Sequence, residues 1–308
     1  APNIYRFTQN RFNNYKMEID VVLSLFDGAS CGQQALNRIG IKPKIYYASE
    51  IDKYAIKATM NKYPDTIQLG SVVDVDVSKL PPINLLIGGS PCTDFSFAGK
   101  RTGMSTKDSI EILTLEHYLE LKSQGFAFEG QSYLFWEYMR ILTDIRKYNP
   151  NVKFLLENVM MGAKWQKVLT KAIGINPIEI NSALVSAQNR RRLCFTNIGA
   201  EQDGLFGDLK CMIPQPKDKG ILLKDILESE VDEKYFLKNE VITKMIGPCN
   251  VLNQGKVVGD SVEKLHSLMA RDYKGFGNQG MTGVVVHNMM PRSSTSGKGG
   301  TGQMTRND

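Results

Sequence analysis

The sequence predicts a doubly wound α/β fold built on a mostly parallel sheet. Short apolar runs that stop at Gly, Asp or Glu are typical of buried strands, and they alternate with longer stretches of helical apolar spacing. Small and acidic residues follow the strands, at the edge where ligands bind in this class of fold. The chain of 308 residues is 42% hydrophobic, which is ample for a large core.

The first two strand–helix pairs lie near the N-terminus. The run VVLSLFDG at 21–28 predicts a buried strand that ends at Asp-Gly. Residues 29–40 follow with helical spacing and a glycine stop. The segment 44–52 predicts a second strand that ends in acids, and a second helix follows until Pro64.

The next elements continue the alternation. INLLIGGSP at 83–91 predicts a strand broken by glycines, residues 132–150 a long amphipathic helix, and KFLLENV at 153–159 another strand. The pattern changes after about residue 200, where two prolines and a tail rich in Gly, Ser and Thr appear. We therefore expect a large domain over 1–205 and a smaller, irregular region over 206–308, with a short helix at 222–230.

Composition excludes several classes of site. Five cysteines, odd in number and without a C-x-x-C pair, argue against a disulfide framework, and three separated histidines argue against a metal site. A net charge of +6 permits a nucleic-acid partner without establishing one. No apolar run approaches the roughly 18 residues of a membrane span, and no secretory leader is visible. A cytoplasmic protein with reduced thiols is predicted.

The turn FDGASCG at 26–32 follows the first strand. Its glycines would let the backbone approach a nucleotide-like ligand, although tight packing explains them equally well. The spacing is neither G-x-G-x-x-G nor a P-loop. Glu50 ends the second strand, where such folds place an acid on ribose hydroxyls; a solvated strand end is the alternative. The two strand ends together favour an adenosine-containing ligand.

Cys92 follows the strand at 83–91 in the sequence GGSPCTDFS. An isolated cysteine is more often buried than reactive, but Cys92 lies where active sites occur in this fold, after a proline and two glycines. Glu157 ends the next apolar strand, where a carboxylate suits proton donation; a helix cap is the alternative. Arg190 and Arg192 share one face of an extended chain and suit a phosphate or a base carbonyl, unless they are simply solvated.

In this order, these elements resemble the DNA cytosine-5 methyltransferase family of bacterial and phage type. The resemblance covers about residues 20–200 and is carried by FDGASCG, ASEID, GGSPCTDFS, LLENV and QNRRR. It implies a Rossmann-like methyltransferase domain. It also implies that Cys92 adds to a flipped-out cytosine, that Glu157 holds the ring protonated, and that Arg190, supported by Arg192, holds the base carbonyl.

The resemblance further implies S-adenosylmethionine as methyl donor and double-stranded DNA as partner. The cofactor residues that it implies are Phe26, Asp27, Gly28, Ser30, Gly32, Glu50, Ile51, Ser71 and Pro91. The DNA contacts that it implies are Ser96, Lys100, Arg101 and Gln188. Residues 97–131 are expected to form an extended mobile loop with helical content that closes over DNA.

The sequence departs from the family pattern at two places. Ser71 stands where the family commonly has Asp, so Asp74 is an alternative adenine contact. The usual C-terminal motifs are not found, so we expect a fragment, a chain completed by a second polypeptide, or a degenerate relative. A restriction–modification or phage enzyme in a bacterial or phage-infected cytoplasm fits best. The alternatives are an RNA cytosine methyltransferase and a catalytically weak DNA-binding relative.

Overall fold

The computed structural model divides into two compact units. The large unit comprises Ala1–Ile180 and Arg192–Pro214, and the small unit comprises Asn181–Arg191 and Gln215–Asp308. The structure describes residues 18–92, 94–95, 103–202, 207, 209–228, 232, 256–258, 264–266 and 282–284. The domain boundary that we expect near 205 stays a prediction.

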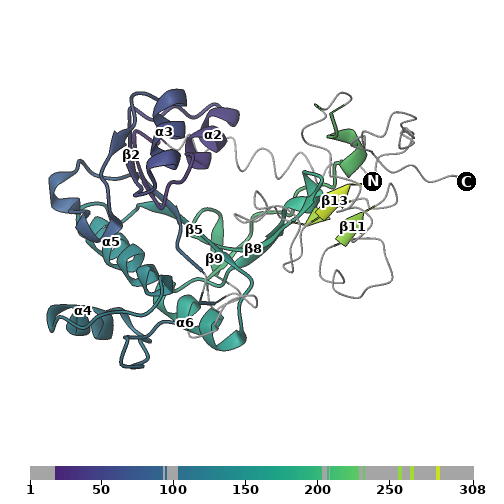
Figure 1. Cartoon of the computed structure of the whole chain (residues 1–308). Helices are drawn as coiled ribbons and strands as arrows, with labels where there is room; N and C mark the ends of the chain where they lie inside the picture. Colours follow the sequence, from purple (N-terminus) through teal and green to yellow (C-terminus); the bar gives the residue numbers. More distant parts are fainter. Residues whose placement is uncertain are drawn as a thin grey trace, which may run out of the picture. The chain divides into compact units, whose positions relative to one another are not determined.

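A seven-stranded sheet forms the centre of the large unit, and it confirms the predicted doubly wound, mostly parallel fold (Figure 1). Neighbouring strands are parallel from β3 to β5, whereas β8 runs antiparallel to β5. The order across the sheet is β3 (Ile67–Gln68), β2 (Ile45–Ser49), β1 (Val21–Leu25), β4 (Leu85–Gly89), β5 (Lys153–Val159), β8 (Arg191–Thr196) and β6 (Ile178–Asn181).

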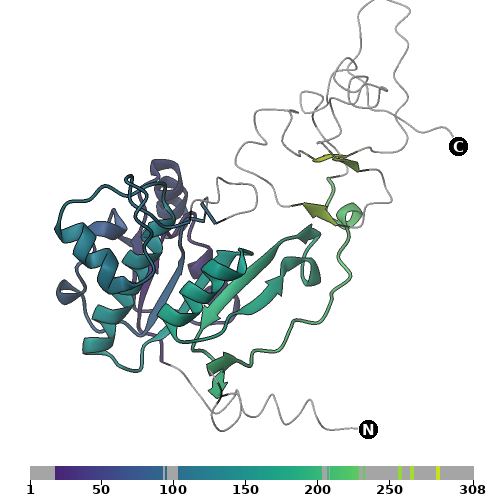
Figure 2. The same cartoon turned by 90° about the horizontal axis from the view of Figure 1, so that it is seen from below.

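Helices cover both faces of this sheet because alternate residues of each strand point to opposite faces. Val22 and Leu85 pack on one face with Leu36 of α2. Leu23 and Leu86 belong to a larger cluster on the other face, to which α4, α5 and α6 contribute. The helices are α2 (Cys31–Arg38), α3 (Lys53–Lys62), α4 (Leu115–Ser123), α5 (Phe135–Tyr148) and α6 (Ala163–Ile173), and Figure 2 shows them from below.

Local chemistry explains where helices begin and end. Asp52 caps α3, because its side chain accepts hydrogen bonds from the amides of Tyr54 and Ala55. Gly174 ends α6 in the left-handed conformation, with φ of 80°. None of the helices in the described part of the chain is long and apolar enough to cross a membrane.

Residues 103–131 contain the predicted helical segment, as α4, but they pack into the core instead of forming an extended loop. Met104 and Ile112 are fully buried, and Tyr118 and Leu121 of α4 join the same core cluster. The apolar residues of this insertion therefore dock it against α5 and α6.

Short strand pairs and turns complete the described elements. A 3-10 turn, η5 (Leu223–Asp225), stands where a helix over 222–230 is predicted. In the large unit, β9 (Ala200–Gln202) pairs with β10 (Leu209–Cys211). In the small unit, β7 (Gln188–Asn189) pairs with β12 (Leu265–His266), and β11 (Lys256–Val258) with β13 (Thr282–Val284).

Candidate active site

The predicted site residues of the large unit gather at the carboxyl edge of the sheet. Strand β1 has β2 on one side and β4 on the other, so the strand order reverses there. This is the switch point at which open α/β sheets bind their ligands. The FDGASCG turn follows β1, Glu50 follows β2 and Cys92 follows β4, while Glu157 lies near the end of β5.

The turn after β1 has an unusual backbone. Phe26, Gly28 and Ser30 all have φ near +57°, at 56°, 58° and 58°, in the left-handed region. Glu50 ties this turn to the end of β2, because its Oε2 accepts the amide of Gly28 at 2.8 Å while its Oε1 accepts the amide of Ile51 at 2.7 Å. The strained turn and Glu50 are thus joined, and together they are called the cradle below; their binding of a cofactor stays a prediction.

Asp27 lies buried beneath this cradle. Its Oδ1 accepts the hydroxyl of Tyr46 at 2.9 Å, whereas its buried Oδ2 has no hydrogen-bond partner within the described residues. Burial raises the pKa of Asp27, although hydroxyl groups nearby oppose this. An acceptor oxygen without a donor is a feature that a hydrogen-bond donor of a bound ligand would satisfy.

Gly32 is required by packing. A Cβ atom at this position would lie 2.2 Å from Cδ1 of Ile87 and 2.7 Å from the hydroxyl oxygen of Tyr46. This contact brings α2 close to β4 and Tyr46 and accounts for the glycine without a ligand. Its predicted role at the cofactor stays a prediction.

Apolar side chains flank Glu50. Ile51 and Tyr54 are both largely exposed near the start of α3. Tyr54 is absent from the residues predicted from the sequence, in which it is one of several exposed aromatic residues. Ser71 lies beyond β3, and its Oγ accepts the amide of Val73 at 3.3 Å as a helix cap.

The Ser-Pro-Cys segment is fixed to β5. Nδ2 of buried Asn158 donates to Oγ of Ser90 at 3.0 Å, one residue before Pro91. Gly89 is opposite Glu157 in the sheet, and a Cβ atom at Gly89 would lie 3.2 Å from Oε2 of Glu157. These contacts hold half-buried Cys92 beside the end of β5, and the glycines permit the close approach.

An ion pair completes this edge of the sheet. Nε of Arg192 lies 2.8 Å from Oε1 of Glu157. The antiparallel register places Arg192 opposite Val159, two positions beyond Glu157. Glu157 is 34% exposed and Arg192 23% exposed, so the pair is still accessible from solvent. A carboxylate oriented by a guanidinium next to the strand that precedes the Ser-Pro-Cys segment can bind a polar heterocycle and move a proton.

Residues 21–173 match the family model described as C-5 cytosine-specific DNA methylase. Residues 21–173, about half of the chain, form a domain of this family. It is 28% identical over 243 residues to the orphan methyltransferase M.Rho11sI of Bacillus phage rho11s, covering 73% of this chain and 47% of that protein. It is 28% identical over 251 residues to the type II methyltransferase M1.ScrFI of Lactococcus lactis subsp. cremoris, covering 78% of this chain and 55% of that protein. The chain thus spans about half the length of these relatives.

Solved structures support the fold of this chain. The S. pombe Dnmt2 methyltransferase has a TM-score of 0.55 at 18% identity, over 87% of this chain and 77% of that chain. A Spodoptera frugiperda DNMT2 mutant has a TM-score of 0.53 at 16% identity, over 85% and 72% of the two chains. These likenesses concern the fold alone.

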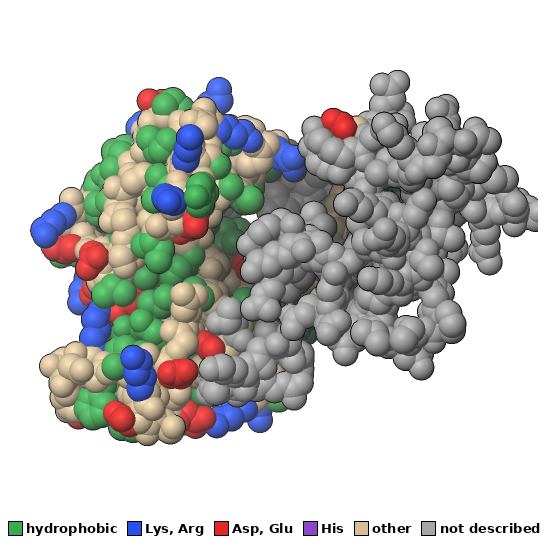
Figure 3. All heavy atoms as spheres, in the orientation of Figure 1, with side chains coloured by type: hydrophobic (Ala, Val, Ile, Leu, Met, Phe, Trp, Pro, Cys, Tyr) green, Lys and Arg blue, Asp and Glu red, His purple; other side chains and the backbone are tan. Residues whose placement is uncertain are grey.

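The remaining predicted residues belong to the small unit or fall outside the described residues. Gln188 and Arg190 belong to the small unit, where the amide of Arg190 donates to Oδ1 of Asn181 at 3.1 Å. The predicted DNA contacts Ser96, Lys100 and Arg101 lie outside the described residues. Figure 3 shows Lys and Arg side chains over α2 and α3 and also along the left and lower edges of the described face, among apolar and acidic side chains.

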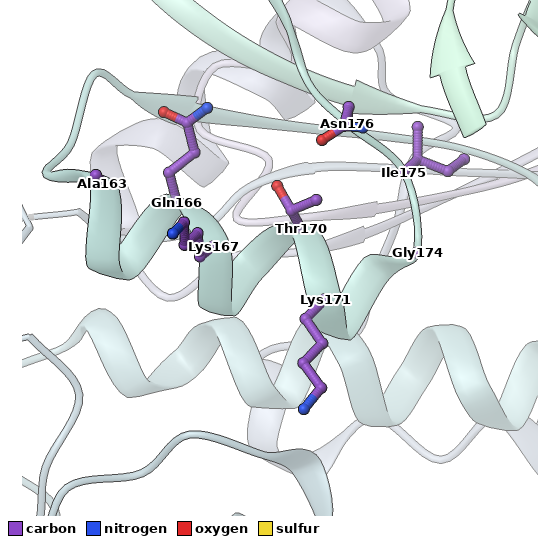
Figure 4. A pocket seen from close by; sticks show the side chains of 8 residues that line it. All are labelled: Ala163, Gln166, Lys167, Thr170, Lys171, Gly174, Ile175 and Asn176. Atoms are coloured by element: carbon purple, nitrogen blue, oxygen red, sulfur yellow. The ribbon is translucent and has the colours of Figure 1, made fainter. Parts of the chain in front are cut away.

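Cys194, which is opposite Glu157 in the sheet, and a groove along α6 have no role in the predicted chemistry. Burial raises the pKa of Cys194 to about 11, which makes it an unreactive core thiol, in agreement with its position inside an apolar strand. A polar groove of about 630 Å³ runs along α6 (Figure 4). It is lined by Ala163, Gln166, Lys167, Thr170, Lys171, Gly174, Ile175 and Asn176, and it includes no predicted site residue.

Proposed function

We propose that this chain is the catalytic part of a DNA cytosine-5 methyltransferase that takes its methyl group from S-adenosylmethionine. The Glu157–Arg192 pair beside the Ser-Pro-Cys segment, at the switch-point edge of the sheet, is the observation that carries the proposal. The match of residues 21–173 to the C-5 cytosine-specific DNA methylase family supports it.

The chemistry needs a nucleophile because aromaticity makes C5 of cytosine unreactive. The thiolate of Cys92 would form a bond to C6, and the ring electrons would then make C5 able to accept a methyl group from a sulfonium donor, whose sulfur would leave with the bonding electrons as a neutral thioether. Glu157 holds the proton at N3 and accepts from the exocyclic amine, while Arg192 keeps that carboxylate oriented. Arg190 binds the base carbonyl. Loss of the C5 proton to a base then breaks the bond between Cys92 and C6 and restores the aromatic ring.

The cradle at the ends of β1 and β2 fits the proposed cofactor. S-adenosylmethionine supplies a methyl group on a sulfonium centre, and the unpartnered Oδ2 of Asp27 is a suitable acceptor beneath its amino-acid end. Glu50 would accept the ribose hydroxyls, and Ile51 with Tyr54 would cover the adenine ring. The other predicted cofactor residues, among them Pro91 and Ser71, stay predictions.

Double-stranded DNA is the proposed partner. C6 is inaccessible in a stacked duplex, so the target base must leave the helix. Ser96, Lys100, Arg101 and Gln188 are the proposed contacts to DNA. We propose a bacterial or phage-infected cytoplasm as the setting. No finding favours a second chain, and the proposal does not include one.

Covalent trapping tests this proposal. Duplex DNA that contains 5-fluorocytosine blocks loss of the ring substituent, so a productive complex with S-adenosylmethionine should stay covalently linked. We expect an adduct with the wild type and with Cys211→Ser, which removes a thiol in β10, but none with Cys92→Ser. An adduct in Cys92→Ser would reassign the nucleophile. The absence of any wild-type adduct with duplex DNA, together with methylation of tRNA, would favour the RNA alternative.

A further inference from the structure

A buried carboxylate lies two residues after the proposed nucleophile. The amide of Phe95 donates to the carbonyl of Cys92 at 3.1 Å and closes a turn that contains Asp94. Asp94 is only 7% exposed. An acid so close to the reacting thiol, yet turned away from solvent, needs partners that account for its burial.

The partners of Asp94 come from the far end of the insertion. Its Oδ2 accepts the amides of Gln131 and Ser132, each at 3.0 Å, and its own amide donates to Oγ of Ser132 at 3.1 Å. Its carbonyl accepts the amide of Gly103 at 3.1 Å. Asp94 therefore joins the turn after β4 to the residues that begin and end the described part of the insertion, 103–131, at the start of the helix leading into α5.

Gly130 shows how tightly this contact is built. Its φ is +64°, and a Cβ atom there would lie 2.3 Å from Oδ2 of Asp94. Only glycine combines this backbone conformation with room for the carboxylate. Gly125, in the same insertion, also has a positive φ of +79°, but it has nothing within 4 Å of its Cβ position.

Cys92 therefore lies between two anchors. On one side, Asn158 of β5 holds Ser90, and on the other, Asp94 holds the start of the helix leading into α5. We propose that Asp94 is a positioning residue that sets the place of the Cys92 thiol relative to Glu157. The role of Asp94 in catalysis rests on the proposed function, whereas its effect on the position of the Cys92 thiol does not.

Alkylation of Cys92 tests the positioning without any substrate. With iodoacetamide and mass spectrometry on the native chain, Asp94→Ala should raise the rate at Cys92 by about tenfold, because loss of two hydrogen bonds releases the turn. The exposed thiol of Cys31 serves as internal reference. Asp94→Asn should restore the wild-type rate, since one amide oxygen can still accept both backbone donors.

Asn84→Ala is the matched control for lost stability. Oδ1 of Asn84 likewise accepts two backbone amides, those of Asp20 and Val21, but at the opposite end of β4. It should lower the stability by a similar amount and leave the Cys92 rate unchanged. Equal rates in Asp94→Ala and Asn84→Ala, or failure of Asp94→Asn to restore the rate, would overturn the assignment.

A second pair of variants removes the dependence on one substitution. Gly130→Ala displaces Asp94, whereas Gly125→Ala carries the same backbone strain in open space. Only the first should speed alkylation of Cys92. In the trapping experiment, both Asp94→Ala and Gly130→Ala should form adduct about tenfold to a hundredfold more slowly, as expected for a misplaced nucleophile. Wild-type adduct rates in both would refute the proposal, while no adduct in the wild type would count against the proposed function alone.

Discussion

Glu137 of α5 is buried completely and holds the insertion to the body of the large unit. It accepts hydrogen bonds from the hydroxyl of Tyr118, from Nζ of Lys122 at 2.5 Å and from Nε of Arg140 at 2.7 Å. Arg140 in turn donates to the carbonyl of Val72 at 3.2 Å, in the turn after β3. One carboxylate thus links α4, α5 and the segment next to Ser71.

Replacement of Glu137 by Gln removes the charge and keeps the size. Arg140, only 19% exposed, would then lack its main anion. Removing one partner of a buried ion pair costs about 3–5 kcal/mol. Lys122 is a third exposed, so water compensates part of its loss, and we expect about 3 kcal/mol in total. This corresponds to a fall in Tm of roughly 6–12 °C for a unit of this size.

Urea unfolding at pH 7 measures this effect, with the two buried tryptophans, Trp136 and Trp165, as fluorescence probes. Glu116→Gln, at an exposed position of α4, should change the stability by less than about 0.5 kcal/mol. A loss in the free energy of unfolding below about 1 kcal/mol in Glu137→Gln would refute the reasoning. The cost of burying Glu137 and Arg140 as charged groups would then be about equal to their mutual attraction.

Three further outcomes follow from the large unit. Because burial raises the pKa of Asp27, the folded state keeps a proton that the unfolded state has lost. The stability should therefore fall as the pH rises from the ordinary pKa of 3.8 through the raised pKa. The urea midpoint should fall less between pH 4 and pH 7 in Asp27→Asn than in the wild type. Gly32→Ala should cost about 1–3 kcal/mol in urea unfolding through its clash with Ile87, whereas Gly162→Ala, with open space around its Cβ, should be close to neutral. Cys194, with a pKa of about 11, should resist alkylation at pH 8 in native protein and react only after unfolding, as peptide mass spectrometry can show.

Local patterns were sufficient to predict the elements that form the site. The apolar run at 153–159 predicts a strand with the bounds that β5 has, and the amphipathic run at 132–150 contains α5. Since carboxyl ends of parallel strands meet at one edge, the approach of the FDGASCG turn, Glu50 and Cys92 also follows from the sequence.

Contacts between distant segments could not be predicted in this way. The insertion of β8 between β5 and β6 depends on long-range pairing, so nothing local shows that Arg192 is the partner of Glu157. Asp94 and Glu137 look like ordinary surface acids in the sequence. Both are buried because the insertion folds back against them. The many polar residues of the insertion give no sign of this packing in the sequence.

The pairing of β8 with β5 ties a reactive edge to the hydrophobic interior. Leu193 and Phe195 alternate with Arg192 along β8, and both are buried in the main core. A shift of one residue would turn these two side chains toward the opposite face and replace Arg192 beside Glu157 by a neighbour. Weaker packing of Phe195 in the core would therefore displace Arg192 from Glu157 first. The loss of this ion pair would come before the unfolding of the chain.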